Sequence, residues 1–377
     1  MKKSNVFKLF IAIGVTFFLA GVACYNPFLR IKPKNEPDIY REPKGWVVST
    51  LAGSGATGSG NGGFADGQGE EARFNRPEGI TVDNAGNVYV AEFAGHRIRK
   101  VTPGGMVSTL AGDGTAGFAN GQGTAAQFYC PQGVTVDNSG YLYVGDAHNH
   151  LIRKITPNGT VSTLAGSGHI GTGVGNGGYV DGAGTIAEFN TPYGIAVDSS
   201  GNVYVADVVN RKIRMINKAG YVTTLGDGYT PPIPFNTRDV AIDRAGNIYV
   251  ADTYRILKIT PGRDVAIFAG NGTNGYANGP GTEAKFDVIQ GVAVDKFGNV
   301  YVADMKNCRI RKITPDGVVS TLAGSGLTGI APYGGFADGE SDVALFNGPW
   351  GVAVDNKGNV YVADTYNHCI RKIEPYY

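Results

Sequence analysis

Six side chains of differing chemistry occupy one slot in a repeated sequence pattern, directly before the glycine or aspartate that opens a short apolar run. The residues in this slot are Glu78, Gln132, Tyr193, Arg238, Gln290 and Trp350. Amides, aromatic rings and single charges are the groups that orient a ligand in a pocket. The slot therefore predicts a ligand-binding mouth if the repeats gather around a common axis. Drift among unconstrained surface residues is the alternative interpretation.

A second variable slot follows the next apolar run of each repeat, and we expect it to form a loop on the same rim. Its residues are Ala94, His148, Val209, Tyr254, Lys306 and Tyr366. Loops held by a rigid scaffold are common places for recognition. We therefore add His148, Tyr254, Lys306 and Tyr366 to the predicted ligand-binding residues.

Histidines are the other residues that could carry chemistry, because three of them can hold a catalytic zinc ion. The chain has five, and His96, His150 and His368 share one slot in three repeats, while His148 and His169 lie elsewhere in loops. Equal slots in different repeats would lie far apart for some pairs. No Ser-His-Asp spacing, phosphate loop or paired-cysteine metal motif is present in the sequence. We predict no catalytic residue, no metal site and no cofactor.

Acids and arginines repeat with a regularity that indicates a structural frame, since a catalytic group is needed once per site. An acid closes the second apolar run of each repeat: Glu92, Asp146, Asp207, Asp252, Asp304 and Asp364. An arginine lies in the third run of five repeats, with Leu257 in the fourth: Arg99, Arg153, Arg214, Arg311 and Arg371. We expect each acid to pair with the arginine of its own repeat.

All of these slots belong to one pattern that occurs six times between Phe74 and Arg371. An aspartate ends the first run of each copy: Asp83, Asp137, Asp198, Asp243, Asp295 and Asp355. A full copy contains four short runs with period-2 alternation, typical of strands, separated by the Gly, Asn and Pro residues of tight turns. Repeats of this length predict an all-β, six-bladed β-propeller of four-stranded antiparallel blades.

The ends of the pattern predict how the ring closes. The sixth copy reaches its third run at residues 369–373, and no copy of the fourth run follows it. An extra copy of the fourth run lies before the first repeat, at residues 47–53. We therefore expect an N-terminal strand to complete the last blade and to cover its open edge.

The chain resembles NHL-repeat propellers from residue 46 to its end. Asn149-His150-Leu151 is the triplet that names these repeats, and Asn367-His368-Cys369 and Asn307-Cys308-Arg309 are variants in the same slot. The resemblance implies the propeller fold, but propellers of this kind include both binders and enzymes. It leaves a metal-assisted lyase or lactonase as the alternative to a binding scaffold. The metal ligands of such enzymes lie on the innermost strands, and those runs contain no histidine here.

Long connections precede five of the repeats, at residues 54–73, 113–127, 167–188, 271–285 and 325–345. Each contains an aromatic residue followed two residues later by Asp-Gly or Asn-Gly, which predicts an ordered loop anchored on the sheet. Asp66, Asp181 and Asp338 leave calcium binding as an alternative. We expect these loops on the same face as the NHL-type loops.

The fourth repeat departs from the pattern. It has Asp239 in place of the glycine, lacks the proline before Arg238, and has a short leading connection with Pro231, Pro232 and Pro234. A low wall at this blade would open a side entrance to the mouth. Decay of a non-functional blade is the alternative.

The N-terminus predicts export. Lys2, Lys3 and Lys8 precede an apolar run at residues 9–23, which is short for a membrane span but typical of a signal peptide. Cys24 follows a small residue, which indicates lipidation, with a secreted or periplasmic protein as the alternative. We divide the chain into a signal peptide at 1–23, an extended tether at 24–45 and the NHL-repeat propeller at 46–377.

Charge and cysteine content limit the partners. The formal net charge is +1, and removal of three signal-peptide lysines would leave −2, so nucleic acid is not an expected partner. A disulfide between Cys308 and Cys369 is left open. We predict a membrane-anchored scaffold of the cell envelope that binds a protein, peptide or glycan and is not an enzyme.

Overall fold

The computed structural model describes residues 43–56, 58, 60–168, 176–225, 236–326 and 334–377. The chain divides into two units, Met1–Pro43 with Tyr377, and Lys44–Tyr376. The predicted signal peptide, Cys24, nearly all of the predicted tether, His169 and the proline-rich connection before the fourth repeat lie outside the described residues. No helix in the described ranges is long and apolar enough to cross a membrane.

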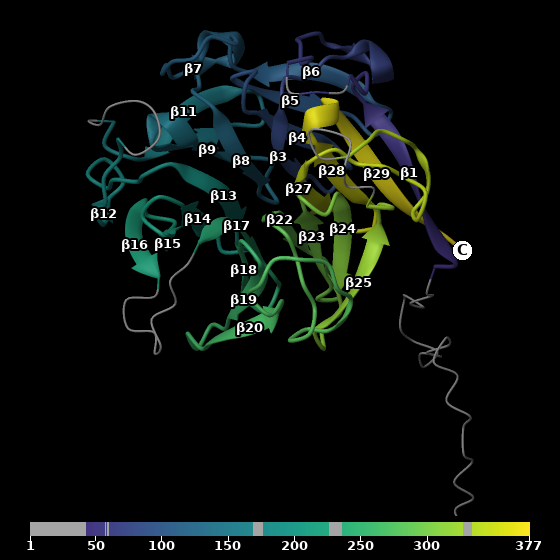
Figure 1. Ribbon diagram of the computed structural model, residues 1–377. Helices are drawn as coiled ribbons and strands as arrows, with labels where there is room; N and C mark the ends of the chain where they lie inside the picture. The colour runs from purple at the N-terminus through teal and green to yellow at the C-terminus, as the bar shows by residue number, and fades with distance from the viewer. Residues whose placement is uncertain (1–42, 57, 59, 169–175, 226–235, 327–333) are drawn as a thin grey trace, which may run out of the picture. The chain divides into compact units, whose positions relative to one another are not determined.

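The Lys44–Tyr376 unit is a six-bladed β-propeller, as the repeats predict (Figure 1). Five blades have four strands and an additional two-residue outer strand, and the fourth blade has four strands among the described residues. From the centre outwards, the first blade contains β3 (Pro77–Val82), β4 (Val88–Glu92), β5 (Arg97–Val101), β6 (Met106–Ala111) and β2 (Gly67–Gln68). The second contains β8 (Pro131–Val136), β9 (Leu142–Asp146), β10 (Leu151–Ile155), β11 (Thr160–Ala165) and β7 (Gly121–Gln122).

The remaining blades follow the same order. The third contains β13 (Pro192–Val197), β14 (Val203–Asp207), β15 (Lys212–Ile216), β16 (Tyr221–Leu225) and β12 (Gly182–Ala183). The fourth contains β17 (Thr237–Ile242), β18 (Ile248–Asp252), β19 (Arg255–Ile259) and β20 (Val265–Ala269). The fifth contains β22 (Ile289–Val294), β23 (Val300–Asp304), β24 (Arg309–Ile313), β25 (Val318–Ala323) and β21 (Gly279–Pro280). The sixth contains β27 (Pro349–Val354), β28 (Val360–Asp364), β29 (Cys369–Tyr376), β1 (Gly45–Ala52) and β26 (Gly339–Glu340).

Four short 3-10 helices complete the described elements. They are η1 (Gly69–Glu71), η2 (Gly123–Ala125), η3 (Ala147–Asn149) and η4 (Thr365–Asn367). The first two lie in the long connections, and the last two lie between the second and third strands of blades two and six. None is long enough to form a layer of its own, so the core is made by the sheets.

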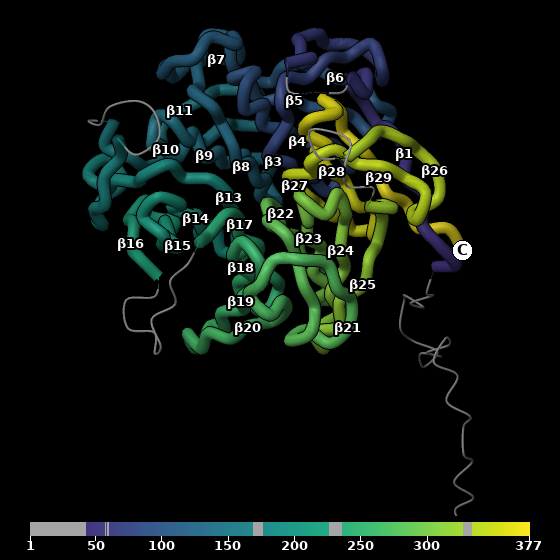
Figure 2. Tube along the Cα trace, viewed as in Figure 1, coloured from purple at the N-terminus to yellow at the C-terminus, as the bar shows by residue number. Residues whose placement is uncertain are grey.

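The ring closes through the N-terminal strand, as predicted. Strand β1 pairs antiparallel with β29, with Val48 opposite Ile373, and pairs on its other side with β26 (Figure 2). Val48 is buried against the core between the fifth and sixth blades. The last blade is therefore built from both ends of the propeller unit.

The turn between the first two strands of a blade is fixed by its aspartate. The Asp83 carboxylate accepts hydrogen bonds from the backbone N–H groups of Ala85 and Asn87 and from the side chains of Asn87 and Tyr89, at 2.8–3.1 Å. A carboxylate that binds nearby backbone N–H groups stabilises a tight turn. The structural interpretation of these aspartates is confirmed.

A buried arginine joins each regular blade to the loop that precedes it. Arg153 donates to the Asp146 carboxylate at 2.7 Å, to two backbone carbonyls and to the side chain of Asn120. Its guanidinium also lies near the rings of Phe118 and Phe128. The four other arginine–acid pairs are Arg99–Glu92, Arg214–Asp207, Arg311–Asp304 and Arg371–Asp364. The predicted pairing is confirmed, and the loop residue is an additional partner that the repeat pattern did not indicate.

The aromatic–glycine segments lie elsewhere than predicted. Residues Gly67 and Gln68 pair with Val107 and Met106 at the start of β6, and Gly69 donates its backbone N–H to Gly105 in the β5–β6 turn. That turn belongs to the face opposite the NHL-type loops. The segment therefore runs along the outer edge of its blade. The Asp66 carboxylate holds it there by binding the Arg99 side chain and the backbone N–H of Thr109. The expectation that this segment lies on the NHL-loop face is wrong.

Candidate ligand-binding mouth

The six innermost strands enclose a central channel. Strands β3, β8, β13, β17, β22 and β27 follow one another around the axis (Figure 1). Residues from all six line a cavity of about 190 Å³. Glycines permit this close approach, because a Cβ atom on Gly79 would lie 2.1 Å from the carbonyl oxygen of Gln132 in the next blade. Such a contact is far inside van der Waals distance, so a side chain at Gly79 would force the first two blades apart.

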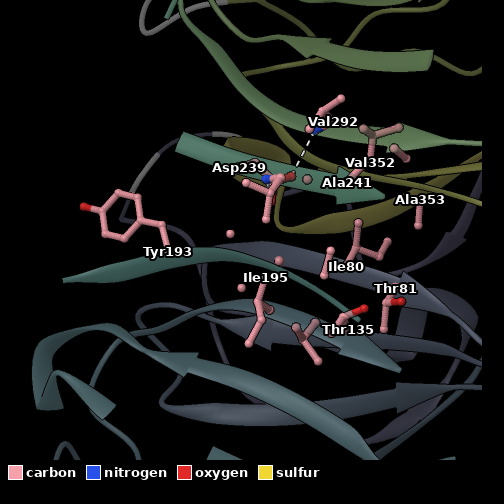
Figure 3. Close-up of a pocket in the computed structure, with 18 of the residues that line it drawn as sticks. Ile80, Thr81, Thr135, Tyr193, Ile195, Asp239, Ala241, Val292, Val352 and Ala353 are labelled. Carbon is pink, nitrogen blue, oxygen red and sulfur yellow. Dashed lines mark hydrogen bonds between the residues drawn. The ribbon is translucent and has the colours of Figure 1, made fainter. Parts of the chain in front are cut away.

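The first predicted ring of ligand-binding residues does come together. All six of its members line the channel: Glu78, Gln132, Tyr193, Arg238, Gln290 and Trp350. We call these six the mouth residues, and the end of the channel where they lie the mouth. Figure 3 shows Tyr193 at this end, with its ring directed away from the aliphatic side chains of Ile195 and Ile80. The repeat pattern places the mouth residues at the starts of the inner strands, and the propeller brings those starts into one ring.

Glu78 is the most deeply placed acidic group of the mouth. Its side chain is fully buried and accepts a hydrogen bond from the Arg76 guanidinium at 2.9 Å. Burial raises the pKa of Glu78 to about 8, although the charge of Arg76 acts in the opposite direction. At neutral pH the carboxyl group is therefore mostly protonated.

Arg76 is a mouth-side residue that the sequence patterns above did not single out. Its guanidinium binds Glu78 and lies 4.7 Å from the ring centre of Phe93 and 5.9 Å from that of Tyr366. These contacts hold a partly exposed cation at the rim. The sequence does contain a signal for Arg76. It lies directly before the proline of its repeat, and the residue at this position varies among the repeats as the mouth residues do.

Several buried polar atoms at the mouth have no hydrogen-bond partner among the described residues. They are Glu78 Oε2, Gln132 Oε1, Gln290 Oε1, Arg76 Nε and Arg238 Nε. The side chains of Glu78, Gln132 and Gln290 are at most 5% exposed. An unsatisfied buried polar group costs about 1–3 kcal/mol, so folded proteins seldom keep several in one place without a bound partner. The mouth therefore offers polar groups to a ligand or to water.

Asp239 takes the place of the glycine in the fourth blade and points into the channel. Its carboxylate accepts hydrogen bonds from the backbone N–H of Val292 at 2.9 Å (Figure 3) and from that of Val240 at 2.8 Å. Removal from water raises its pKa to about 7. Asp239 thus bridges the fourth and fifth blades and adds a second titratable carboxyl group to the channel.

The second predicted ring does not line the cavity. His148 packs edge-on against Phe93 and Tyr129, with ring centres 5.6 and 5.0 Å away. Tyr366 lies beside Arg76. Tyr254 and Lys306 donate their backbone N–H groups to the carbonyl oxygens of Asp252 and Asp287 respectively. These four residues surround the rim, and none of them faces the channel directly.

The three histidines of the shared NHL slot do not converge. Each accepts, through Nδ1, a hydrogen bond from a backbone N–H in the following blade: His96 from Cys130, His150 from Thr191 and His368 from Arg76, at 3.0–3.1 Å. Each is in the left-handed backbone region. We call these contacts the inter-blade histidine bonds. They occupy the side chains of the conceivable three-histidine site, and no group of three metal-ligating side chains occurs in the described part of the chain.

Contacts also bear on the calcium site and the disulfide that the sequence left open. The Asp66, Asp181 and Asp338 carboxylates bind the buried arginines of their blades and a backbone N–H of the outer strand, so their oxygens are already engaged.

Cys130, Cys308 and Cys369 are buried and form no disulfide. The sulfur of Cys308 occupies the histidine slot and accepts from the backbone N–H of Gly348.

Comparison with known proteins agrees with the repeats. The family model for the NHL repeat matches residues 74–101, 128–155 and 346–373. The chain is 30% identical over 315 residues to NHL repeat-containing protein 2 of Bos taurus, covering 79% of this chain and 38% of that protein. It thus spans well under half the length of this relative.

Two solved structures show the same fold at low identity. An auxiliary nutrient binding protein from Bacteroides ovatus superposes with a TM-score of 0.66 and 19% identity, covering 90% of this chain and 79% of the other. A gluconolactonase from Xanthomonas campestris superposes with a TM-score of 0.55 and 12% identity, covering 89% and 97%. The chain therefore carries NHL repeats and folds as a six-bladed β-propeller.

Proposed function

We propose that the protein is a non-enzymatic binding scaffold that recognises the end of an extended partner in the mouth of its central channel. The observation that carries this proposal is the set of buried, unpartnered polar atoms on Glu78, Gln132 and Gln290. The three residues come from three different blades, and all of them line one cavity. A ligand that forms hydrogen bonds with these atoms would remove the cost of leaving them unsatisfied.

The size of the cavity limits what enters it. Pockets that enclose a drug-sized ligand measure about 300–1,000 Å³, whereas the channel offers about 190 Å³. The mouth therefore suits one small unit of a larger molecule, such as a terminal residue of a peptide or glycan. The rest of such a partner would lie over the rim residues His148, Tyr254, Lys306 and Tyr366.

Location in the cell envelope is part of the proposal. The predicted signal peptide and Cys24 support export and lipid anchoring, with a secreted or periplasmic form as the alternative. The Bacteroides ovatus protein that shares this fold is described as nutrient binding. A propeller on a membrane anchor would present its mouth to material outside the cell.

The test is capture of envelope and secreted material on the immobilised full-length protein. Alanine at Trp350, Tyr193 or Arg238 should weaken capture by about 1–3 kcal/mol without lowering the melting temperature, because aromatic and arginine side chains dominate binding energies. Phe64→Ala and Phe336→Ala, on exposed outer-edge aromatics, are the matched controls. Unchanged capture by the mouth variants, with loss in the outer-edge variants, would place recognition on the perimeter instead.

A further inference from the structure

The mouth residues form three opposite pairs. Because the inner strands follow one another in chain order around a six-membered ring, blades one and four, two and five, and three and six lie opposite each other. Glu78 thus lies across from Arg238, Gln132 across from Gln290, and Tyr193 across from Trp350. A ligand at the centre would meet two amides, two aromatic rings and an acid–base pair at the same time.

The unpartnered atoms show what such a ligand must supply. Three of them are oxygens, on Glu78, Gln132 and Gln290, and two are N–H donors on the guanidinium groups of Arg76 and Arg238. The amide oxygens of Gln132 and Gln290 require O–H or N–H donors from the ligand. The unpartnered oxygen of Glu78 carries the proton when the group is protonated, because the other oxygen accepts from Arg76, and it then donates to the ligand. The guanidinium groups can donate to an acceptor on the ligand, and a carboxylate matches their planar geometry best.

The balance of charge at the mouth favours an anion. Arg76 and Arg238 are cations at every physiological pH. Burial raises the pKa of Glu78 to about 8 and that of Asp239 to about 7, so the two carboxyl groups are protonated for much of the time at neutral pH. The two arginine charges are then not fully balanced, and a bound carboxylate would balance them.

The aromatic pair favours a ring-shaped ligand. Tyr193 and Trp350 supply large, rigid and amphipathic surfaces on opposite sides of the mouth. A pyranose ring has an apolar face for such surfaces, and its hydroxyl groups are donors for the unpartnered amide oxygens and acceptors for a protonated Glu78. A peptide terminus also supplies a carboxylate, but a free C-terminus brings few further groups for three side chains on different blades.

We propose that the mouth binds an acidic monosaccharide unit, a pyranose that carries a carboxylate, at the end of a longer glycan. The carboxylate would bind Arg238, the hydroxyl groups would donate to Gln132 and Gln290 and accept from Glu78, and the ring would contact Trp350 or Tyr193. This inference rests on the proposed function, because it requires the mouth to be the binding site.

The test is calorimetric titration of the full-length protein with galacturonate and glucuronate, with their neutral parents galactose and glucose, and with a dipeptide. We expect one uronate per chain and clearly weaker binding of the neutral sugars and the dipeptide. Arg238→Gln should weaken uronate binding by about 10- to 100-fold, the loss expected for a charge-assisted contact. Arg244→Gln is the matched control, since Arg244 is an exposed arginine in the turn at the other end of the same inner strand.

The outcomes separate this inference from the proposed function. Equal binding of neutral and acidic sugars would overturn carboxylate recognition, and preferred binding of the dipeptide would overturn the ligand class. If none of these probes binds while mouth variants still lose envelope capture, the ligand class is wrong and the mouth remains the site. If none binds and the mouth variants keep full capture, both the inference and the proposed function fail.

Discussion

Single residues of this propeller connect one blade to the next. His368 accepts from the Arg76 backbone N–H through Nδ1, and its Nε2 lies 2.8 Å from the Gly58 carbonyl oxygen. Because Arg76 then reaches Glu78, the histidine of blade six helps to position a cation at the mouth of blade one. Arg211 occupies the same slot in blade three. Its partner would lie in the fourth repeat, which is one residue shorter before its inner strand and lacks the residue whose backbone N–H donates in this contact.

The inter-blade histidine bonds should make folding stability depend on pH. Burial is the main cause that lowers the pKa values of His96 and His368 from 6.5. Below about pH 6.5 the unfolded chain therefore takes up protons that these folded side chains do not. Their contribution to the free energy of unfolding is complete above about pH 6.5 and is lost as pH falls through the lowered pKa values. His368→Ala should cost about 1–2 kcal/mol at pH 8 and should reduce the further loss seen on acidification to pH 5.

Urea unfolding at the two pH values measures this effect. Arg211→Ala is the control, since it removes a side chain from the equivalent slot without removing an inter-blade histidine bond. An equal cost for the two substitutions at pH 8, or an unchanged acid dependence in His368→Ala, would contradict this role.

Residues that repeat were predictable, and residues that act between blades were not. The acid–arginine pairs and the turn aspartates occur in nearly every copy, so their common role was evident from the pattern alone. Arg76, Asp239 and the shared histidine slot act on the neighbouring blade, and the distance to that blade is fixed only by the packing of six sheets. The mouth residues were predictable because they vary inside a constant frame, and the position of Arg76 carries the same signal.

At the scale of strands and loops, the buried arginines explain why regular blades have a fifth strand. Each of these arginines binds an acid of its own blade and an Asp or Asn of the preceding loop, as Arg153 binds Asp146 and Asn120. The loop is thereby held along the outer edge, where its next two residues pair with the fourth strand. Blade four has Leu257 in this place, and its acid, Asp252, pairs with Arg255 instead.

Removal of one buried arginine should destabilise its blade strongly. Arg153→Leu leaves Asp146, which is fully buried, without its cation, and we expect a loss of about 3–5 kcal/mol in unfolding free energy. Asp146→Asn in the same chain should recover part of this loss, because it removes the uncompensated charge. Lys154→Leu, at the next position of β10, should change stability by no more than about 0.5 kcal/mol.

Chemical unfolding of these three variants and the parent protein provides the comparison. Similar losses for Arg153→Leu and Lys154→Leu would show that the buried pair does not carry the stability assigned to it.

The fifth strand itself was not predictable, since two residues are too few to show a period and one of them is a glycine. The course of each loop depends on a contact between residues about 33 positions apart, such as Asn120 and Arg153.

At the scale of the whole molecule, ring closure depends on a strand from the start of the propeller unit. Strand β1 lies between β29 and β26 and fills the place of the fourth strand in the last blade. This arrangement was predictable, because the repeat pattern has an extra fourth run at one end and lacks one at the other. The side entrance suggested for blade four stays a prediction, since the proline-rich connection lies outside the described residues.

Truncation tests this closure. A chain that begins at Gly53 lacks β1 and should be insoluble or unfolded, because it exposes the edge of β29 and removes Val48 from the core. A chain that begins at Lys44 keeps β1 and should retain the melting temperature of the full-length protein. Equal thermal stability of the two truncated proteins would refute closure by β1.

Recognition at the mouth of the channel can be measured directly, because the chain has two tryptophans in different places. Trp350 lines the mouth, whereas Trp46 lies on β1 in the outer part of the last blade. Trp46→Phe leaves a single fluorescent reporter at the mouth, and Trp350→Phe leaves one far from it. Each protein is titrated with the soluble glycan and peptide fractions released from the cell envelope. We expect a saturable change in emission from the Trp46→Phe protein alone. A saturable change confined to the Trp350→Phe protein would contradict recognition at the mouth.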